Sequence, residues 1–238
     1  MNLPLSKRLL ACCGFVRPGD RVADIGCDHG YLGIYLLTHH MASSVIAADI
    51  NEMPLQSAMH NGEKYGLSDK MSFHLSDGVQ NVPHDFDTLV CAGMGADTMV
   101  SILEAAPWLR DPKYRLILQC QSKTPMLRQY LSDQGFSITE ETVLRDGRFL
   151  YTVMQVEYDP HAPRLTVGQY YFPPALLVDP APELPEYYGR LLFSLRRANH
   201  GRGEAADPQM VAALQELEAL ANDPKLTWLK EESHDHSK

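Results

Sequence analysis

The stretch "ADIGCDHGYLGIYLL", residues 23–37, decides the fold. A short apolar run ends near Asp24, passes through Gly26 and Gly30, and continues as a helix-like pattern. A strand, a glycine turn and a helix in this order are typical of a nucleotide-binding loop in a parallel α/β sheet. The spacing is wrong for a pyrophosphate loop, because Asp28 stands where a glycine is needed. Its carboxylate would repel a diphosphate, so a dinucleotide such as NAD is disfavoured.

Strand-like and helix-like runs alternate from this loop onward, which is the pattern of a mostly parallel α/β sheet. The predicted strands are residues 21–25, 44–49, 71–75, 86–92, 115–120, 136–144 and 149–158. The predicted helices are residues 31–41, 54–65, 96–105 and 124–134. Gly66 and Gly135 stand where helix ends favour a left-handed residue. The last two strands flank "RDGR", residues 145–148, and this turn predicts an antiparallel hairpin.

Five parallel strands followed by such a hairpin match the layout of a class I methyltransferase. We therefore expect a Rossmann-like domain with a seven-stranded sheet whose last strand is antiparallel, over residues 1–159. Residues 160–238 have a different texture, because prolines break the first part into what we interpret as a surface linker. Two amphipathic helices are then expected, an arginine-bearing one around residues 187–197 and a second beginning at Asp207-Pro208. They predict a small, coiled-coil-like helical hairpin with a polar tail.

The composition fits an intracellular enzyme. A chain of 238 residues with 45% hydrophobic content can bury a full core. Five cysteines without C-x-x-C spacing argue against a disulfide framework and favour a reducing, cytoplasmic location. The apolar run after Lys7 and Arg8 is short and is interpreted as a helix rather than a signal peptide. No run approaches the ~18 apolar residues of a membrane span, and no obligatory protein partner is evident.

The net charge of −9 counts against a protein that coats nucleic acid nonspecifically. It does not exclude a local basic patch. The basic cluster of note is residues 187–202, "YYGRLLFSLRRANHGR", which holds four arginines and no acid.

Carboxylates follow the first three predicted strands. An acidic loop suits a ligand with an ammonium and a sulfonium, so charge complementarity favours S-adenosylmethionine over a diphosphate. Asp24 is expected to reach the ammonium, and Asp49, about 20 residues beyond the loop, to accept bonds from the ribose hydroxyls. Asp77 is placed for the adenine amino group. Each aspartate alone could equally be a turn former at a strand end, but the ordered series favours the cofactor site.

After the fourth strand the chain reads "CAGMGADTM", residues 91–99. Many methyltransferases that act on amino groups have Asn/Asp-Pro-Pro-aromatic at this point, which positions a side-chain oxygen against the nucleophile. Here Gly93 and Gly95 let the backbone approach a ligand, and Met94 could pack on it. The sequence therefore does not support chemistry that relies on a positioned amide or carboxylate at this loop.

Several short motifs together resemble one family, the bacterial tRNA methyltransferases that modify N1 of the adenine at position 22, in the D-arm. They are "LSKRL", "ADIGCDHGYL", "ADIN" followed by "QSA", "SDGV", "AGMG" and "LILQ", and the resemblance covers roughly residues 5–156. Cys27 departs from a frequent serine, and "LILQCQ" departs from "LILQP" followed by asparagine, which leaves Gln119 and Gln121 as polar candidates near the base. The resemblance implies cofactor contacts by Asp24, Gly26, Cys27, Asp28, Gly30, Asp49, Ile50, Asn51, Asp77, Gly78, Gly93 and Met94.

The reaction that the resemblance implies needs little acid-base help. Adenine N1 carries its own lone pair, so positioning and desolvation are the main requirements. Asp28 and His29 are the candidates to accept a proton from N6, with Gln119 as a further catalytic candidate, although His29 could instead serve only to shape the loop.

A base that is paired or stacked in folded RNA would have to be extruded. The candidates to hold the RNA backbone are Lys7, Arg8, Arg190, Arg196 and Arg197. Arg190, Arg196 and Arg197 could equally form the solvated face of a helix and have no function in binding.

Two other functions stay open. A methyltransferase for a small molecule would need a lid over the pocket, and no long insertion is visible to form one. A noncatalytic protein that binds the cofactor or RNA is the other alternative. Zinc held by Cys27, Cys91, Cys120 and His29 is disfavoured, because free cysteines commonly fill apolar space at strand ends. We therefore predict no metal.

Overall fold

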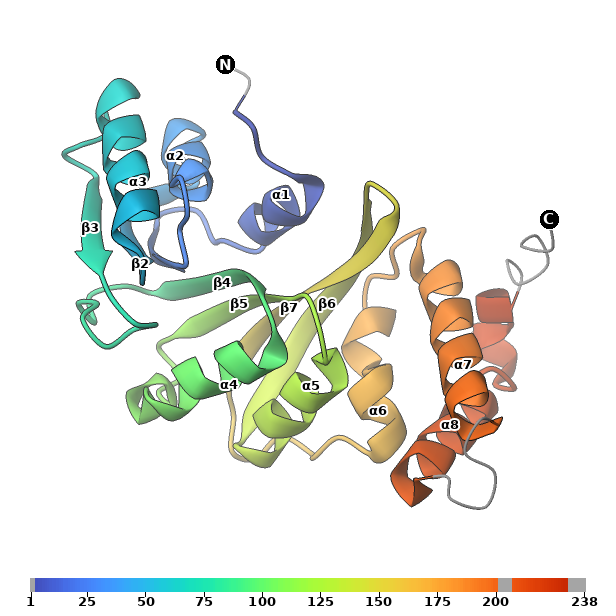
Figure 1. The fold of residues 1–238 in the computed structure, drawn as a ribbon. Helices are drawn as coiled ribbons and strands as arrows, with labels where there is room; N and C mark the ends of the chain where they lie inside the picture. Colours follow the sequence, from blue (N-terminus) through green and yellow to red (C-terminus); the bar gives the residue numbers. More distant parts are fainter. Residues whose placement is uncertain (1–2, 201–206, 231–238) are drawn as a thin grey trace.

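The computed structural model describes residues 3–200 and 207–230, so the predictions for the turn at 201–206 and the polar tail at 231–238 lie outside the described residues. Its centre is a seven-stranded sheet in the order β3-β2-β1-β4-β5-β7-β6 (Figure 1). The strands are β1 (Asp20–Ile25), β2 (Ala42–Asp49), β3 (Met71–Leu75), β4 (Thr88–Met94), β5 (Arg115–Cys120), β6 (Phe136–Asp146) and β7 (Phe149–Tyr158).

The direction of the strands confirms the predicted fold class. The pairs among β1 to β5 are all parallel, whereas β7 runs antiparallel to both β5 and β6. The chain reverses between β6 and β7 at Gly147, whose φ of 60° suits the first central position of a type II′ hairpin turn. The sheet is thus seven-stranded with its last strand antiparallel, and the predicted hairpin is confirmed.

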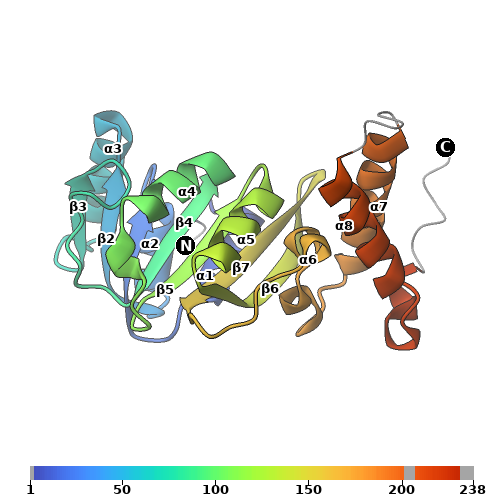
Figure 2. The ribbon, with the colours of Figure 1, turned by 90° about the horizontal axis from the view of Figure 1, so that it is seen from below.

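Helices cover both faces of the sheet (Figures 1 and 2). One face carries α1 (Lys7–Gly14), α2 (Tyr31–Thr38) and α3 (Glu52–Lys64), and the other carries α4 (Ala96–Glu104), the short η1 (Pro107–Leu109) and α5 (Thr124–Asp133). Gly66 and Gly135, just beyond α3 and α5, have φ values of 68° and 79°, as the sequence predicted for helix ends. Within the described residues, no helix is both long and apolar enough to cross a membrane.

The chain beyond β7 is more structured than a surface linker. It forms α6 (Val167–Tyr171), η2 (Pro174–Leu177), α7 (Leu184–His200), α8 (Pro208–Leu220) and η4 (Pro224–Lys230). The prolines did not prevent these helices because several stand in first turns, where the missing N–H has no helical partner. Phe172 and Leu176 are buried together with Tyr188 of α7 and Leu217 of α8. Asp207 caps α8, as predicted. The division into two domains at residue 159 stays a prediction.

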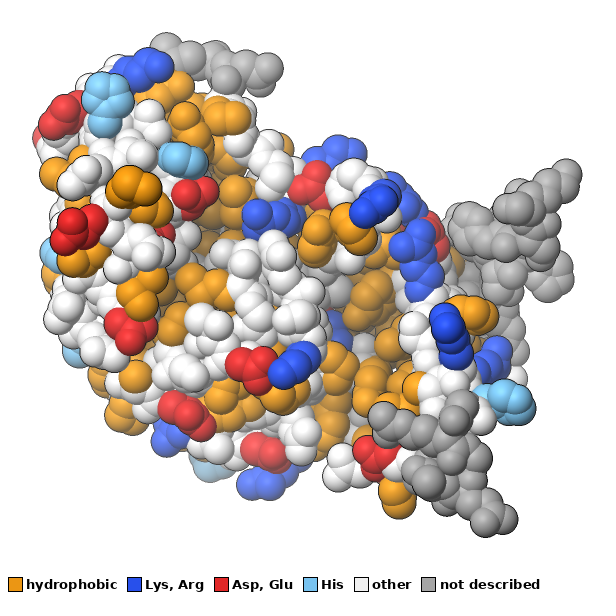
Figure 3. Space-filling view, viewed as in Figure 1, with side chains coloured by type: hydrophobic (Ala, Val, Ile, Leu, Met, Phe, Trp, Pro, Cys, Tyr) orange, Lys and Arg blue, Asp and Glu red, His pale blue; other side chains and the backbone are white. Residues whose placement is uncertain are grey.

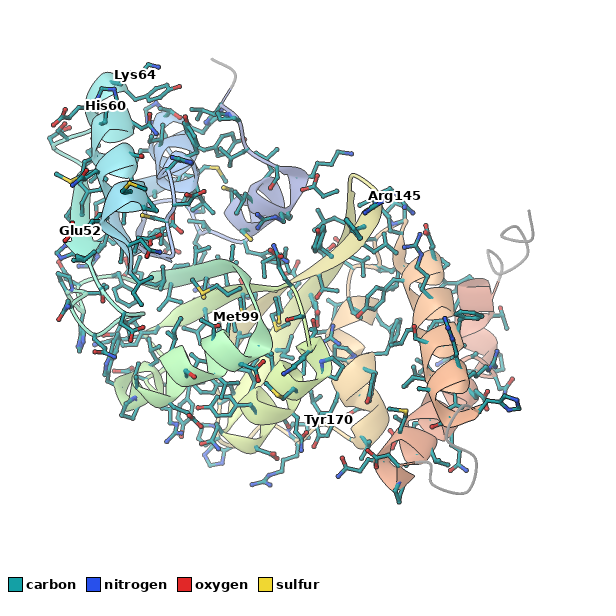
Figure 4. All side chains as sticks on the ribbon, in the orientation of Figure 1. Glu52, His60, Lys64, Met99, Arg145 and Tyr170 are labelled. Carbon is teal, nitrogen blue, oxygen red and sulfur yellow. The ribbon has the colours of Figure 1, made fainter. Side chains whose placement is uncertain are left out.

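A buried ion pair joins the sheet to this C-terminal part. The Arg128 guanidinium of α5 donates to both carboxylate oxygens of Glu141 on β6, at 2.5 and 3.2 Å, and neither side chain is exposed. Its Nη1 also donates to the carbonyls of Tyr170 and Tyr171 at 3.0 and 2.8 Å. Figure 4 labels Tyr170 on α6, beside α5. The Arg128 side chain therefore holds α6 against both α5 and β6.

Candidate active site

A cavity of about 670 Å³ opens at the carboxyl ends of β1, β2 and β4. This is the edge at which open parallel sheets bind ligands, and the volume is in the usual range for a small-molecule site. Ser6, Arg8 and Leu9, at the start of α1, form part of its wall. Figure 3 shows the hollow on this face, between the part formed by α2 and α3 and the part formed by α4.

The structure brings nearly all of the predicted cofactor contacts to this cavity. Its lining includes Asp24, Gly26, Cys27, Asp28, Asp49, Ile50, Asn51, Asp77, Gly78, Gly93 and Met94. Gly30 is the exception: it is buried at the start of α2, and a Cβ there would lie 3.0 Å from the Cβ of Ala58 on α3. The role of Gly30 is to let α2 and α3 pack closely.

Asp24 is the most unusual group in the cavity. The residue is 4% exposed, and its Oδ2 has no hydrogen-bond partner among residues 3–200 and 207–230. Burial, with the neighbouring carboxylates of Asp49 and Asp28 adding to it, raises its pKa to about 7. Buried acceptors are nearly always satisfied in folded proteins. A ligand that brings a positively charged donor would supply what Asp24 lacks.

A second unsatisfied atom lies in the same cavity. The buried Oγ of Ser6, the residue before α1, has no hydrogen-bond partner among the described residues. Three described residues have a buried side-chain oxygen without a hydrogen-bond partner: Ser6, Asp24 and Asn199. The first two line the cavity. Two residues of the cavity lining therefore each keep a buried polar oxygen without a partner among the described residues. Ser6 lies within the "LSKRL" motif, but nothing in that motif singles out its hydroxyl as a group of the cavity.

Asp49 holds the loop between β1 and α2 in place through two hydrogen bonds. Its Oδ2 accepts a hydrogen bond from the backbone N–H of Asp28 at 3.1 Å, and its Oδ1 accepts from that of Asn51 at 2.9 Å. The first bond keeps Asp28 in a left-handed conformation, with φ of 51°, which few residues other than glycine and asparagine or aspartate adopt. Each carboxylate oxygen has a second lone pair, so Asp49 retains capacity for ligand hydroxyls.

Gly26 lets the loop after β1 approach the end of β4. A Cβ at Gly26, where φ is 73°, would lie 2.3 Å from the Cε of Met94, the last residue of β4. Met94 in turn lies with its sulfur 3.4 Å from the Sγ of Cys91. The loop after β1 therefore packs directly on the end of β4, and Cys27 is buried with its thiol pKa raised by burial.

The two predicted proton acceptors lie at the rim. The side chains of Asp28 and His29 are well exposed, and His29 Nε2 lies 3.6 Å from Asp28 Oδ1. The backbone carbonyl of His29 accepts a hydrogen bond from Asn61 of α3, which anchors the loop. Both side chains are free to face a molecule that approaches the cavity from solvent.

Gln119 lies behind the cavity instead of in it. Its side chain is fully buried, and its Oε1 accepts from Arg8 Nη1 at 3.0 Å and from the backbone N–H of Gly93 at 3.1 Å. Its Nε2 donates to the carbonyl of Cys120. Gln119 therefore positions Arg8 and the loop of Gly93, and its predicted contact with a base does not fit this placement. Gln121 is exposed near Gly93 and remains the polar group on the outside of that loop.

The predicted RNA-binding residues have different surroundings. Lys7 is exposed on α1, one residue from Arg8, which lines the cavity. On α7, Arg190 pairs with Glu186 at 2.6 Å, and Arg196 pairs with Glu218 of α8 at 2.8 Å. Arg197 is exposed and has no ion-pair partner within the described part of the chain. Arg196 thus faces α8, whereas Arg197 faces solvent.

Metal binding finds no support in the described residues. They contain no group of three or more His, Cys, Asp or Glu that could hold an ion. All five cysteines are free and buried. Burial raises the pKa of the Cys12 and Cys91 thiols to about 12, so these groups behave as apolar filler.

Comparisons with known proteins agree with this geometry. A family model described as "Methyltransferase domain" matches residues 5–154. The chain is 35% identical over 157 residues to the tRNA (adenine(22)-N(1))-methyltransferase of Bacillus subtilis (strain 168), an alignment that covers 66% of each chain. The chain thus spans slightly less than two thirds of this curated relative.

Two solved structures extend the likeness over nearly the whole chain. The B. subtilis M1A22 tRNA methyltransferase TrmK is 29% identical and has a TM-score of 0.77, with 97% of this chain and 99% of that chain covered. Streptococcus pneumoniae Sp1610, a putative tRNA (m1A22) methyltransferase solved in complex with S-adenosyl-L-methionine, is 29% identical with a TM-score of 0.78. That alignment covers 90% of this chain and 98% of the other.

Proposed function

The chain belongs to the methyltransferase-domain family, and from this premise we propose that it transfers a methyl group from S-adenosylmethionine to N1 of adenine 22 in the D-arm of tRNA. The observation that carries the proposal is a buried carboxylate oxygen of Asp24 that finds no partner in the described part of the chain, in a cavity that Asp28, Asp49 and Asp77 also line. The relatives with this fold that are named for their activity support the choice of substrate.

The residues present fit S-adenosylmethionine. Asp24 would accept a hydrogen bond from the cationic amino group, Asp49 from the ribose hydroxyls, and Asp77 from the adenine amino group. Gly26 and Gly78, with φ of 73° and 57°, keep the two loops compact beside the cavity. The cofactor supplies a methyl group made electrophilic by a sulfonium. The anionic lining favours such a ligand and disfavours a diphosphate.

The chain's own residues would act mainly by position. Adenine N1 attacks with its own lone pair, so no side chain has to remove a proton first. Arg8, held by Gln119, and Gly93 and Met94 at the end of β4 line the cavity together with the aspartates. Asp28 and His29 at the rim are the groups in reach of an exocyclic amino group. Their role would be to hold or accept the N6 proton as the ring becomes cationic.

Lys7 and Arg197 are the proposed contacts to the RNA backbone among the sequence candidates, since both are exposed without an ion-pair partner among the described residues. Arg190 shares Glu186 and keeps half of its side chain exposed. Arg196 is engaged by Glu218 and is the weakest candidate. Arg8 would contact the nucleotide nearest to the cavity, because it lines the cavity itself.

The direct test is methyl transfer with defined RNA. The purified protein is incubated with radiolabelled S-adenosylmethionine and tRNA transcripts that carry adenine or guanine at position 22, and the RNA is digested to nucleosides. Label in 1-methyladenosine that depends on adenine 22 is the expected result. Label only in small metabolites would support the alternative small-molecule methyltransferase. Cofactor binding without any transfer would support a noncatalytic binding protein.

A further inference from the structure

The β6–β7 hairpin projects past the sheet at the edge where the cavity opens. β5 pairs with β7 only from Met154 to Glu157, so the part of β7 from Phe149 to Val153 runs on beyond the last pair. At about 3.4 Å per residue this is an arm of about 17 Å. Because β7 is antiparallel, its beginning lies at the carboxyl edge of the parallel strands. The tip therefore stands at the same edge as Asp24 and Asp49.

The two faces of this arm are attached to different parts of the molecule. Val153 and Leu144 pack in the cluster that contains α1, and the backbone N–H of Arg8 lies 3.4 Å from Asp146 Oδ2. On the other face, Val143 packs with α7, and Arg145 forms an ion pair with Glu186. Figure 4 labels Arg145 at the tip, facing α7. The tip thus bridges the cavity wall and the C-terminal helices.

The tip exposes an aromatic ring and an unpaired cation. Phe149 is 51% exposed although it is large and apolar. The guanidinium of Arg148 lies over its ring, 4.9 Å from the centroid, and has no carboxylate partner among the described residues. Tyr151 is the next residue on the same face of β7, with its ring 6.2 Å from that of Phe149.

The same combination recurs along one stripe of α7. Glu186, Arg190, Phe193 and Arg197 follow each other at helical spacing, and Phe193 is 67% exposed. Arg145, on the face of the hairpin opposite to Phe149, pairs with Glu186, so this stripe begins directly beside the hairpin. Figure 3 shows basic side chains in a row over the hairpin and α7, on the face where the cavity opens.

We propose that the hairpin tip contacts the substrate RNA, with Phe149 stacking on an unpaired base and Arg148 binding a phosphate, and that the contact continues along α7 through Phe193 and Arg197. The proposal rests on the proposed function. Exposed aromatic rings interleaved with arginines are what single-stranded or looped RNA requires. The chain has a net charge of −9, so a local cluster of positive charge is unusual in it. Such a cluster favours an anionic partner such as RNA over an uncharged protein surface.

The experiment measures the affinity for the tRNA substrate, with cofactor affinity and the circular dichroism spectrum as checks of folding. Phe149→Ala should weaken tRNA binding at least about fivefold. Phe149→Trp, which keeps a stacking ring, should bind nearly as tightly as the wild type. Arg148→Ala should reduce the slope of log affinity against log salt by about one. Cofactor affinity should not change in any of these variants.

Two neighbouring arginines give a matched control. Arg197→Ala should weaken tRNA binding, whereas Arg196→Ala, which removes only the exposed pair with Glu218, should not. If the wild type methylates tRNA while Phe149→Ala and Arg148→Ala leave affinity and salt slope unchanged, the hairpin proposal is overturned and the proposed function stands. If the wild type binds the cofactor but neither binds nor methylates tRNA, both proposals fall.

Discussion

Gln119 at the end of β5 accepts a hydrogen bond from Arg8 of α1 at 3.0 Å, although the two residues are 111 positions apart in sequence. The same oxygen accepts the backbone N–H of Gly93 at 3.1 Å. One buried amide thus connects the N-terminal helix to the last residues of β4, at the wall of the cavity.

Gln119→Leu should lower kcat more than it changes cofactor affinity. The substitution removes the acceptor of the part-buried hydrogen bond from the Gly93 N–H, at a cost of about 1 kcal/mol in stability, and frees Arg8 from its place. Arg8→Ala removes one end of the same contact. In a double-mutant cycle on kcat, the Arg8→Ala and Gln119→Leu effects should therefore be markedly non-additive. Additive effects would mean that the two residues act independently.

Gly93→Ala should impair catalysis beyond its effect on stability. The φ of 83° disfavours any side chain, by roughly 1–2 kcal/mol, and the new Cβ would lie 3.1 Å from Arg8 Nη1. The matched control is Gly66→Ala, because Gly66 has a φ of 68° and nothing within 4 Å of its Cβ. Thermal unfolding should show a similar loss of stability for both variants, and only Gly93→Ala should lower kcat. An equal loss of kcat in both would rule out a local role of Gly93.

Asp24→Asn should stabilise the free protein at neutral and alkaline pH while it weakens cofactor binding. In the folded state the pKa of Asp24 is about 7, compared with the ordinary 3.8. The folded state therefore holds this proton more tightly, and the stability that protonation contributes is lost as pH rises from about 4 to about 7. Its upper limit is about 4 kcal/mol.

The melting temperature measured against pH checks this sign. Asp24→Asn and the wild type should melt at similar temperatures near pH 4, and the variant should melt several degrees higher above pH 7. In the wild type, affinity for S-adenosylmethionine should fall as pH drops below about 7, because the carboxylate becomes protonated. A variant that is less stable than the wild type at pH 8, with unchanged cofactor affinity, would contradict the assignment.

Arg128→Met should strongly destabilise the protein. It leaves the fully buried Glu141 without its cation and two carbonyls of α6 without a donor, for which about 3–5 kcal/mol is expected. The double variant Arg128→Met with Glu141→Leu should recover part of the loss. Arg196→Ala, which breaks an exposed pair, should cost less than about 1 kcal/mol. Urea unfolding of the four proteins measures these differences.

Local patterns were sufficient for the elements of the fold. The strand of residues 115–120 and that of 149–158 were predicted with their observed bounds, and α2 begins at Tyr31 as expected. The "RDGR" turn and the glycines after α3 and α5 were predictable because a turn or a helix end depends on the backbone conformation of a few consecutive residues. The proline-rich stretch is more helical than its composition predicts, because proline breaks a helix in its interior but is tolerated in its first turn, where Pro174 and Pro208 stand.

The ordered aspartates indicated the cavity because parallel strands bring their carboxyl ends to one edge. The sequence by itself therefore determined the class I layout, the family and the edge at which a cationic cofactor fits. It could not place Gln119 behind the cavity, leave Ser6 unpaired within it, or separate Arg196 from Arg197, because each depends on a partner distant in sequence. Only the tertiary structure decided these points, since hydrogen bonds and ion pairs form between side chains that packing brings together.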